Sequence, residues 1–253
     1  MAVSLSKLQS TLDEMLMPEQ FSDYAPNGLQ VEGRPEVSLL ITGVSACQAL
    51  IDQALDLGAD AILVHHGFFW RGESPVLTGM KRRRIGALLS ADTSLFAYHL
   101  PLDAHPEFGN NACLARLLGI RVDGSLDPAD PQSVGNTGHF EQAMTTQELL
   151  QDIERVLQRP PLHVGNQARE IKRVAWCTGA AQGYIEAAVR AGVDAYITGE
   201  VSEQTVHVAR EEGIELIAAG HHATERYGVQ AVGAELALRL GLEHRFLEVA
   251  NPV

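Results

Sequence analysis

Two stretches of the sequence decide the fold: TGVSACQALIDQALDLGADAILVHH at residues 42–66 and TGAAQGYIEAAVRAGVDAYITGE at residues 178–200. Each reads as a buried strand, a helix ended by glycine and a second short strand. Aligned with a two-residue gap, they share these residues: Thr42-Gly43 with Thr178-Gly179, Ile51 with Ile185, Gly58 with Gly192, and Asp60-Ala61 with Asp194-Ala195. A repeat of this length is not a solenoid period, so it indicates an ancestral duplication of one α/β unit.

The next strand of each half continues the match. AYHLPLD at 97–103 aligns with AGHHATE at 219–225, which sets His99 on His221 and Asp103 on Glu225. The same register sets His65 and His66 opposite Gly199 and Glu200. The sequence therefore predicts an α/β fold of two similar lobes that face each other across a cleft, with strand ends of both lobes converging on it.

Strand and helix patterns alternate along the chain, which predicts βαβ units and a largely parallel sheet. The expected strands are 37–45, 60–67 and 95–103, and the expected helices are 4–16, 47–58, 81–92, 110–119 and 145–158. Turn-forming residues fill 22–33, and Asp, Gly and Pro crowd 121–140. We expect a first lobe at 1–120, a connecting segment without an inserted domain at 121–170 and a second lobe at 171–253, together one compact unit.

Composition narrows the class of protein. Apolar residues are 45% and charged residues 20%, as in ordinary globular proteins. The net charge of −13 argues against a protein that holds nucleic acid through counterion release. Three scattered cysteines, Cys47, Cys113 and Cys177, fit a reducing compartment and form no zinc knuckle. With no secretory start and no apolar run long enough to span a membrane, we expect a cytoplasmic protein.

Histidines lie at the ends of three predicted strands. His65-His66 end one, His99 another and His221-His222 a third, and two carboxylates, Asp103 and Glu225, come four residues after His99 and His221. Ligands of open α/β sheets bind beyond the carboxyl ends of the strands. Imidazole and carboxylate donors without thiolates suit zinc, iron, manganese, cobalt or nickel. The donors exceed the needs of one tetrahedral ion, which favours two divalent ions per chain. For any one histidine, a purely structural hydrogen bond is the alternative.

Other residues allow two interpretations. Glu200 is an acid/base or water-positioning group, or else a cap of the helix that begins near Ser202. The basic run Lys81–Arg84 is a solvated helix face, or else it binds phosphate or lines a pore. For the remaining candidates we favour a structural role over ligand contact: Asn27 and Gln30 in a turn, and Phe68, Phe69, Trp70 and Tyr98 in the core or an interface.

Several motifs in a fixed order support a family assignment. They are SDYAPNGLQVEG (22–33), GADAILVHHGFFWRGESPV (58–76), YHLPLDAHPEFGNNA (98–112), VDAYITGEVSEQTVH (193–207) and AGHHATERYG (219–228). In these the chain resembles, from end to end, the YbgI-type proteins of the NIF-like dinuclear metal-centre family, known as GTP cyclohydrolase I type 2 homologues. The resemblance implies a toroidal homohexamer built as a trimer of dimers. It also implies these metal ligands: His65 and His66 from VHHG, Asp103 from HLPLD, and His221 and a bridging Glu225 from AGHHATER, with His99 a ligand or a neighbour of one.

Two classes of function follow. The first is a hydrolase that uses a metal-activated water, with Glu200 or His99 moving the proton and an unidentified small molecule as substrate. The resemblance suggests cyclohydrolase-like opening of a purine ring. The alternative is a metal-binding hexameric scaffold or regulatory protein that engages nucleic acid or protein partners without turnover. Oxidation chemistry at a di-iron site is a third possibility.

Overall fold

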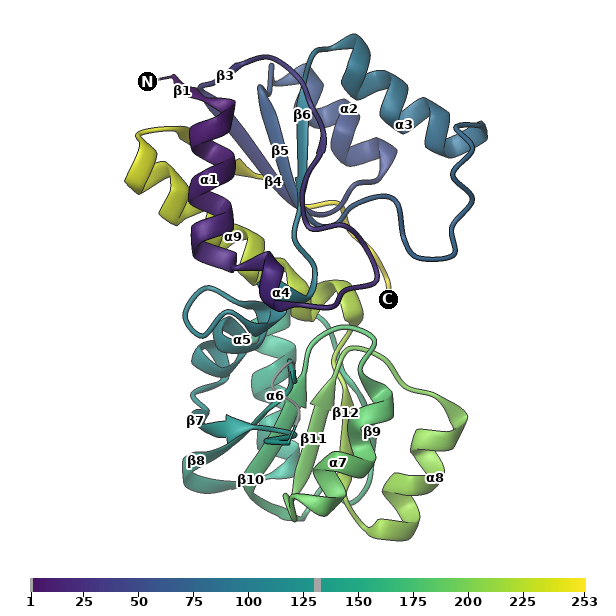
Figure 1. Cartoon of the computed structure of the whole chain (residues 1–253). Helices are drawn as coiled ribbons and strands as arrows, with labels where there is room; N and C mark the ends of the chain where they lie inside the picture. Colours follow the sequence, from purple (N-terminus) through teal and green to yellow (C-terminus); the bar gives the residue numbers. More distant parts are fainter. Residues whose placement is uncertain (1, 130–132) are drawn as a thin grey trace. The chain divides into compact units, whose positions relative to one another are not determined.

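Two α/β units make up the chain, as the duplicated pattern predicts. The computed structural model describes residues 2–129 and 133–253. Unit 1 consists of Met1–Gly109 and Gly228–Ala250, and unit 2 of Asn110–Tyr227 and Asn251–Val253. Helix α9 (His221–Leu240) begins in unit 2 and ends in unit 1. In both units helices cover both faces of a central sheet (Figure 1).

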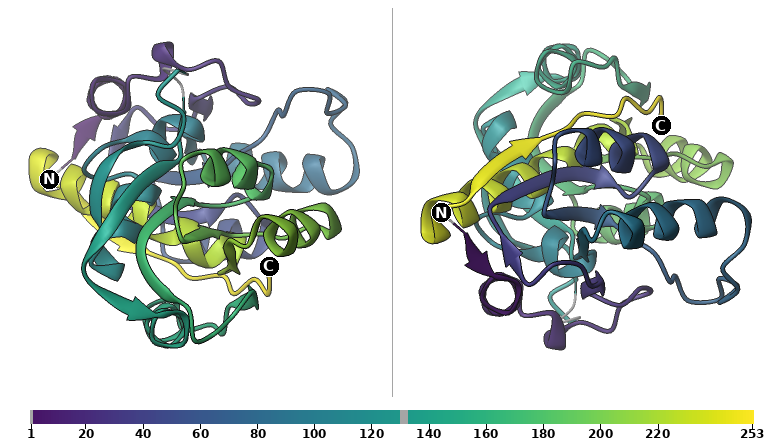
Figure 2. Two further views of the ribbon diagram at one scale, coloured as in Figure 1. Left: turned by 90° about the horizontal axis from the view of Figure 1, so that it is seen from below. Right: turned by 90° about the horizontal axis from the view of Figure 1, so that it is seen from above.

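The sheet of unit 1 has four parallel strands and one antiparallel edge strand. In sheet order they are β13 (Glu243–Phe246), β4 (Leu39–Ser45), β5 (Ala61–His66), β6 (Ser94–Ala97) and the antiparallel β2 (Gly28–Val31). Helices α1 (Leu5–Leu16) and α9 lie on one face, and α2 (Gln48–Asp56) and α3 (Gly79–Ser90) lie side by side on the other (Figures 1 and 2). A short pair, β1 (Val3–Ser4) and β3 (Glu36–Val37), flanks α1.

Alternating apolar residues explain these layers. Successive strand side chains point to opposite faces of a sheet. Leu40, Leu63 and Phe96 accordingly pack with α1 and α9. Their chain neighbours Ile41 and Ile62 pack with α2 and α3 instead. Because both faces are buried, the strands are apolar at nearly every position, as the sequence of a parallel sheet requires.

Unit 2 has a sheet of six strands. In sheet order they are β7 (Arg121–Ser125), β8 (Asn136–Thr145), β10 (Glu170–Cys177), β11 (Ala195–Thr198), β12 (Glu215–Ala218) and β9 (Leu162–Val164). Strands β10, β11 and β12 are parallel, and the others are antiparallel to their neighbours. Helices α5 (Asn110–Leu118) and α6 (Thr146–Leu157) share a core on one face. Helices α7 (Ile185–Arg190) and α8 (Glu203–Glu212) lie side by side on the other face (Figure 2).

Three segments differ from the sequence-based expectation. The expected loop at 22–33 contains strand β2, which extends the sheet beside β6. The expected strand at 95–103 ends at Ala97, and α4 (Leu100–Ala104) follows, because Pro101 suits the first turn of a helix. The expected break at 121–140 contains β7 and the start of β8, while its residues 130–132 lie outside the described part of the chain.

The units also differ from the lobes expected at 1–120 and 171–253. Residues 110–120 belong to unit 2, because Leu114 and Leu118 of α5 pack in its core. Residues 228–250 belong to unit 1, because Val232 and Leu236 pack beside α1 and β13 extends the sheet next to β4. Residues 121–170 supply three strands and a helix to unit 2, so they are more than a connection.

One carboxylate makes the same contacts in both units. Asp60, at the start of β5, accepts hydrogen bonds at Oδ2 from the N–H groups of Ser38 (2.8 Å) and Leu39 (3.0 Å). In unit 2, Asp194 Oδ2 accepts the equivalent hydrogen bonds from the N–H groups of Lys172 (2.9 Å) and Arg173 (2.8 Å). Asp60 thus joins β4 to β5, and Asp194 joins β10 to β11, so the two matched aspartates make the same backbone contacts, which supports the duplication.

These contacts also correct the register of the alignment. With Asp60 set on Asp194, the ladders match Leu40 with Val174, because Leu40 pairs with Ala61 and Val174 with Ala195. The N–H groups of Tyr98 and Ala219 donate to equivalent carbonyls of the second strand, so these two residues also match. His99 therefore corresponds to Gly220 and not to His221. The alignment followed residue identity, whereas backbone hydrogen bonds set the register.

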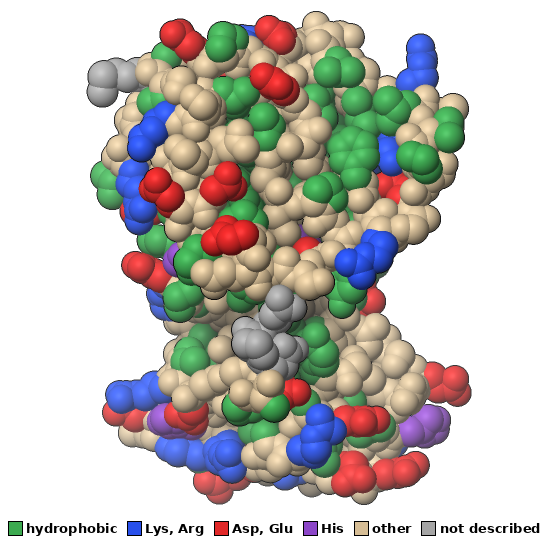
Figure 3. Space-filling view, in the orientation of Figure 1, with side chains coloured by type: hydrophobic (Ala, Val, Ile, Leu, Met, Phe, Trp, Pro, Cys, Tyr) green, Lys and Arg blue, Asp and Glu red, His purple; other side chains and the backbone are tan. Residues whose placement is uncertain are grey.

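On the face drawn in Figure 3, basic and acidic side chains are interspersed over both units. The run Lys81–Arg84 lies on α3, where Lys81 pairs with Glu73 at 3.2 Å and lies 4.9 Å from the Phe69 ring centroid.

Within the described residues, no helix combines the length and apolar character that a membrane span needs.

Replacing Asp60 by alanine is expected to lower the free energy of unfolding by about 2 kcal/mol, because two backbone N–H groups and Arg34 lose a charged acceptor. Asp194→Ala is expected to cost less, because its side chain is 30% exposed against 14% for Asp60. Urea denaturation measures both. The exposed Asp56→Ala on α2 is the control, with a change within about 0.5 kcal/mol. Equal effects of Asp60→Ala and Asp56→Ala would contradict this role.

His244 makes unit 1 sensitive to acid. Its Nε2 lies 2.8 Å from Thr42 Oγ1, and burial lowers its pKa. The unfolded chain therefore binds a proton at a higher pH than the folded chain, so stability falls as the pH drops through about 6.5. We expect His244→Gln to flatten the loss of unfolding free energy between about pH 7.5 and 5.5. The exposed His207→Gln should leave the wild-type slope, and an unchanged slope in His244→Gln would refute the assignment.

Candidate metal centre

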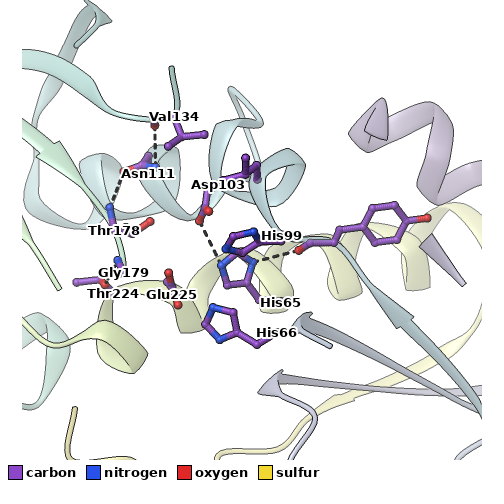
Figure 4. Close-up of polar contacts among 12 residues, drawn as sticks. His65, His66, His99, Asp103, Asn111, Val134, Thr178, Gly179, Thr224 and Glu225 are labelled. Carbon is purple, nitrogen blue, oxygen red and sulfur yellow. Dashed lines mark hydrogen bonds and ion pairs between the residues drawn. The ribbon is translucent and has the colours of Figure 1, made fainter. Parts of the chain in front are cut away.

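Three imidazoles gather at the carboxyl ends of neighbouring strands in unit 1. His65 and His66 end β5, and His99 follows β6, the adjacent parallel strand. One ring nitrogen of each lies within 4.8 Å of the other two. The ring centroids are 4.4 Å apart for His65 and His66 and 5.1 Å apart for His65 and His99. Figure 4 shows the three rings side by side.

Each of these rings is held through Nδ1 by an oxygen atom. The contacts are His65 to the Tyr98 carbonyl at 3.0 Å, His66 to Ser45 Oγ at 3.0 Å and His99 to Asp23 Oδ1 at 2.7 Å. Because the carbonyl can only accept, the proton of neutral His65 is on Nδ1 and its Nε2 has the lone pair. Metal-binding histidines are oriented in this way by outer partners.

Asp103 supplies the carboxylate of unit 1. It lies in the short helix α4, and its side chain is buried. Its Oδ1 lies 3.5 Å from His65 Nε2 (Figure 4). Pro101 lies in the first turn of α4, and the Asp103 N–H donates to the His99 carbonyl at 3.2 Å, so Asp103 lies one turn after His99. The structure thus brings together all four residues predicted for the first half of the site.

Asp23 is a member of this group that sequence reasoning missed. Burial raises the pKa of Asp23, but the hydrogen bond and charge of His99, with hydrogen bonds from Asn27 and Leu100, lower it to about 2. The ionised carboxylate therefore holds His99 in place. Asn27 Oδ1 also accepts the His99 N–H at 2.7 Å. The motif SDYAPNG contained the signal, because Asp and Asn in a turn offer acceptors to a neighbouring backbone.

The nearby aromatic residues separate into two groups. Tyr98 and Phe68 are buried in the core, where Tyr98 donates its hydroxyl hydrogen to Asp13 at 2.6 Å. Trp70 instead borders the imidazoles, with its ring centroid 5.0 Å from that of His99. Gln30 is structural, since its Oε1 accepts the Phe68 N–H at 2.7 Å.

Unit 2 places an imidazole and a carboxylate on one helix. His221 is the first residue of α9, and Glu225 lies one turn later, so both face the same side. His221 Nε2 is 3.0 Å from Glu225 Oε2, and the Glu225 side chain is 3% exposed. The four-residue spacing seen in the sequence thus produces a direct pair.

Glu200 holds the ring of His221. Its Oε1 accepts from His221 Nδ1 at 2.7 Å. Burial lowers the pKa of His221, but the hydrogen bonds and charges of Glu225 and Glu200 raise it to about 9. A cation at Nε2 must therefore displace a proton at neutral pH. Glu200 does not cap α8, because Ser202 caps it in a reciprocal pair with Thr205.

Gly179 makes room for the Glu225 carboxylate. Its φ is +71°, and a Cβ there would lie 2.0 Å from Glu225 Oε1 and 3.3 Å from His221 Nε2. The loop is fixed by hydrogen bonds from the Gly179 N–H to Thr224 Oγ1 and from the Thr178 N–H to Asn111 Oδ1, both 3.1 Å (Figure 4). In the sequence, Gly179 stands out only as part of the repeat, and nothing there indicates the roles of Asn111 and Thr224.

The donor sets of both units fit borderline divalent metals. Unit 1 presents three histidines held at Nδ1 and unit 2 presents one, and in each unit a buried carboxylate lies close to a histidine Nε2 atom. Thiolates take no part in these groups of described residues. Every predicted site residue lies in one of the two groups: His65, His66, His99 and Asp103 in unit 1, and Glu200, His221 and Glu225 in unit 2.

Gly179→Ala should weaken zinc binding roughly tenfold or more, because the added methyl group displaces the Glu225 carboxylate. Gly192→Ala is the matched control: its φ of +65° imposes the same backbone strain, but the nearest atom to the added Cβ is 4.0 Å away. Zinc affinity is measured by chelator competition. Equal affinities of the two variants would show that the space at Gly179 does not serve the site.

Comparison with known proteins identifies the family of this chain. The family model Duf34/NIF3 (NGG1p interacting factor 3) matches residues 3–252. A Pseudomonas aeruginosa protein named GTP cyclohydrolase 1 type 2 homolog is 55% identical over 252 residues, a match that covers 100% of this chain and 100% of that protein. The solved structure of protein ybgI, described as of unknown function, has a TM-score of 0.94 and 50% identity, and covers 99% of this chain and 100% of its own.

A second solved structure, of a protein from Thermus thermophilus, has a TM-score of 0.89 and 33% identity. It covers 99% of this chain and 100% of its own. Both solved structures therefore resemble this chain over unit 1 and unit 2, and the sequence matches also span both units. Identity above half over the whole length and a family model that spans nearly every residue lead to one assignment: the chain belongs to the DUF34/NIF3 family.

Proposed function

We propose that this protein is a hydrolase that depends on two divalent metal ions per chain. One observation carries the proposal: in both units an oxygen holds histidine Nδ1 while Nε2 faces a buried carboxylate of the same unit. A histidine with a purely structural role needs no such pair of fixed contacts. Because the same arrangement of imidazole and carboxylate occurs in both units, we infer that both serve to bind metal.

The proposed ligands are His65, His66 and Asp103 of unit 1 and His221 and Glu225 of unit 2. Zinc, iron, manganese, cobalt and nickel all accept imidazole and carboxylate donors. When bound, such ions lower the pKa of a coordinated water toward about 7 and polarise the bond to be hydrolysed.

Two residues have separate parts in the proposed reaction. His99 accepts and returns the proton, because the Asp23 carboxylate, whose Oδ1 lies 2.7 Å from His99 Nδ1, orients its ring. Glu200 acts through His221, whose ring it orients, and is therefore a positioning residue. This changes the sequence-based hypothesis, in which Glu200 and His99 were equal candidates for proton transfer.

The substrate is proposed from the relatives alone. Their name, GTP cyclohydrolase 1 type 2 homolog, suggests hydrolytic opening of a nitrogen heterocycle. Because shared fold and family do not determine a substrate, a screen should include purine nucleotides together with other cyclic amides and amidines. We further propose the hexamer that the family resemblance implies, which light scattering of the intact protein tests.

Protein purified without a histidine tag is expected to bind two equivalents of metal per chain, measured by elemental analysis. Asp103→Asn and Glu225→Gln each remove a charged donor and should lower the metal content to one equivalent or less. Turnover of any substrate found in the screen should fall roughly a hundredfold or more in both variants, because each ion contributes several kcal/mol to transition-state stabilisation.

The exposed pair His139 and Asp123 provides the matched control, because its ring and carboxylate also lie 2.8 Å apart but outside both groups. Asp123→Asn should retain full metal content and turnover. Wild-type protein that binds no metal after supplementation would refute the proposed centre. Two bound equivalents without any turnover would favour the scaffold alternative.

A further inference from the structure

A pocket of about 250 Å³ opens beside Glu200 in unit 2. Its lining includes Arg159, Glu200 and Val201, with Pro252 and Val253 from the end of the described chain. Glu200 connects the pocket to His221, whose Nδ1 it binds at 2.7 Å. A ligand in this pocket would therefore lie next to a residue that positions a proposed metal ligand.

One nitrogen of the Arg159 guanidinium has no acceptor for its hydrogen atoms among the described residues. This atom, Nη1, is buried. Arg155, one turn earlier at the end of α6, instead pairs with Asp152 at 2.8 Å. A buried donor without an acceptor costs roughly 1–3 kcal/mol, and more if it is charged. An acceptor supplied by a ligand would remove this cost.

The position of Arg159 depends on Gly220. A Cβ at Gly220 would lie 2.7 Å from Arg159 Nη1, 2.9 Å from its Cδ and 3.1 Å from its Cζ. Gly220 has a φ of +102°, which side chains rarely adopt. The guanidinium thus occupies the space that a side chain at residue 220 would need.

The duplication shows how the two units differ at this point. By the register of the ladders, Gly220 of unit 2 corresponds to His99 of unit 1. Unit 1 places a third imidazole there, whereas unit 2 has no side chain and brings in a guanidinium from the end of α6. In unit 2 the Arg159 guanidinium, which donates several hydrogen bonds but does not bind metals, thus replaces an imidazole, which can bind them.

We propose that Arg159 binds an oxyanionic group, phosphate or carboxylate, of a small molecule that occupies this pocket. The planar guanidinium matches both oxyanions with two parallel hydrogen bonds. Glu200, whose Oε1 is already bound by His221, can accept from a hydroxyl or N–H of the same molecule through its other oxygen. The inference rests on the proposed function only in identifying that molecule as the substrate.

Isothermal titration with inorganic phosphate and with acetate tests the site, on protein as purified and after chelator treatment. Arg159→Gln is expected to weaken binding of the preferred anion roughly tenfold or more in both preparations. Arg155→Gln should leave the affinity unchanged, because Arg155 is exposed and paired with Asp152. The two anions separate a phosphate site from a carboxylate site.

Gly220→Ala provides a second variant, in which the charge remains but the added methyl group displaces the guanidinium. It should weaken anion binding as Arg159→Gln does, and Gly241→Ala, at a φ of +69° in unit 1, controls for backbone strain. Failure of wild-type protein to bind either anion, or equal affinity in Arg159→Gln, would overturn the inference. Metal content measured on the same samples tests the proposed function separately, because Arg159→Gln should retain its metal.

Discussion

The hydrogen bond at histidine Nδ1 is the contact on which the candidate centre depends. An imidazole on a strand end can rotate, and a metal ion needs its Nε2 lone pair in one direction. A backbone carbonyl fixes His65, and carboxylates fix His99 and His221. These acceptors come from the end of β6, from the turn before β2 and from the segment after β11, so they are in place only when the sheets have formed.

The parallel sheet provides the reason that the site residues meet. Carboxyl ends of neighbouring parallel strands lie at one edge, so residues that follow β5 and β6 become neighbours without a special loop. Asp60 and Asp194 fix this arrangement at the opposite edge by joining the first two parallel strands of each unit.

Duplication followed by divergence accounts for the differences between the units. His65 and His66 correspond to Gly199 and Glu200, so unit 1 holds the paired imidazoles and unit 2 an orienting carboxylate. His99 corresponds to Gly220, which leaves room for a guanidinium in unit 2. Equivalent strand ends therefore carry imidazoles in unit 1, and a glycine with a carboxylate and a neighbouring guanidinium in unit 2.

Much of the site was predictable because its residues follow a local rule. A histidine after an apolar strand, and a carboxylate four residues later, can be recognised from spacing alone, and the structure pairs His221 with Glu225 as this spacing predicts. The contacts of Asp23, Asn27 and Asn111 were not predictable, because they join segments distant in the sequence. A turn motif shows that a side chain can accept a hydrogen bond but not which donor it meets.

The sequence by itself determined the α/β class, the duplication, the family and which histidines and carboxylates gather at the strand ends, because these depend on short-range periodicity and on residue type. Only the tertiary structure decided which segments belong to each unit. Helix α5 and the second part of α9 each pack in the core that buries their apolar faces, although each follows directly in sequence on the other unit. The tertiary structure also decided that Glu200 orients His221 and that Gly220 makes room for Arg159. Those contacts depend on distances across a folded sheet, which no spacing along the chain encodes.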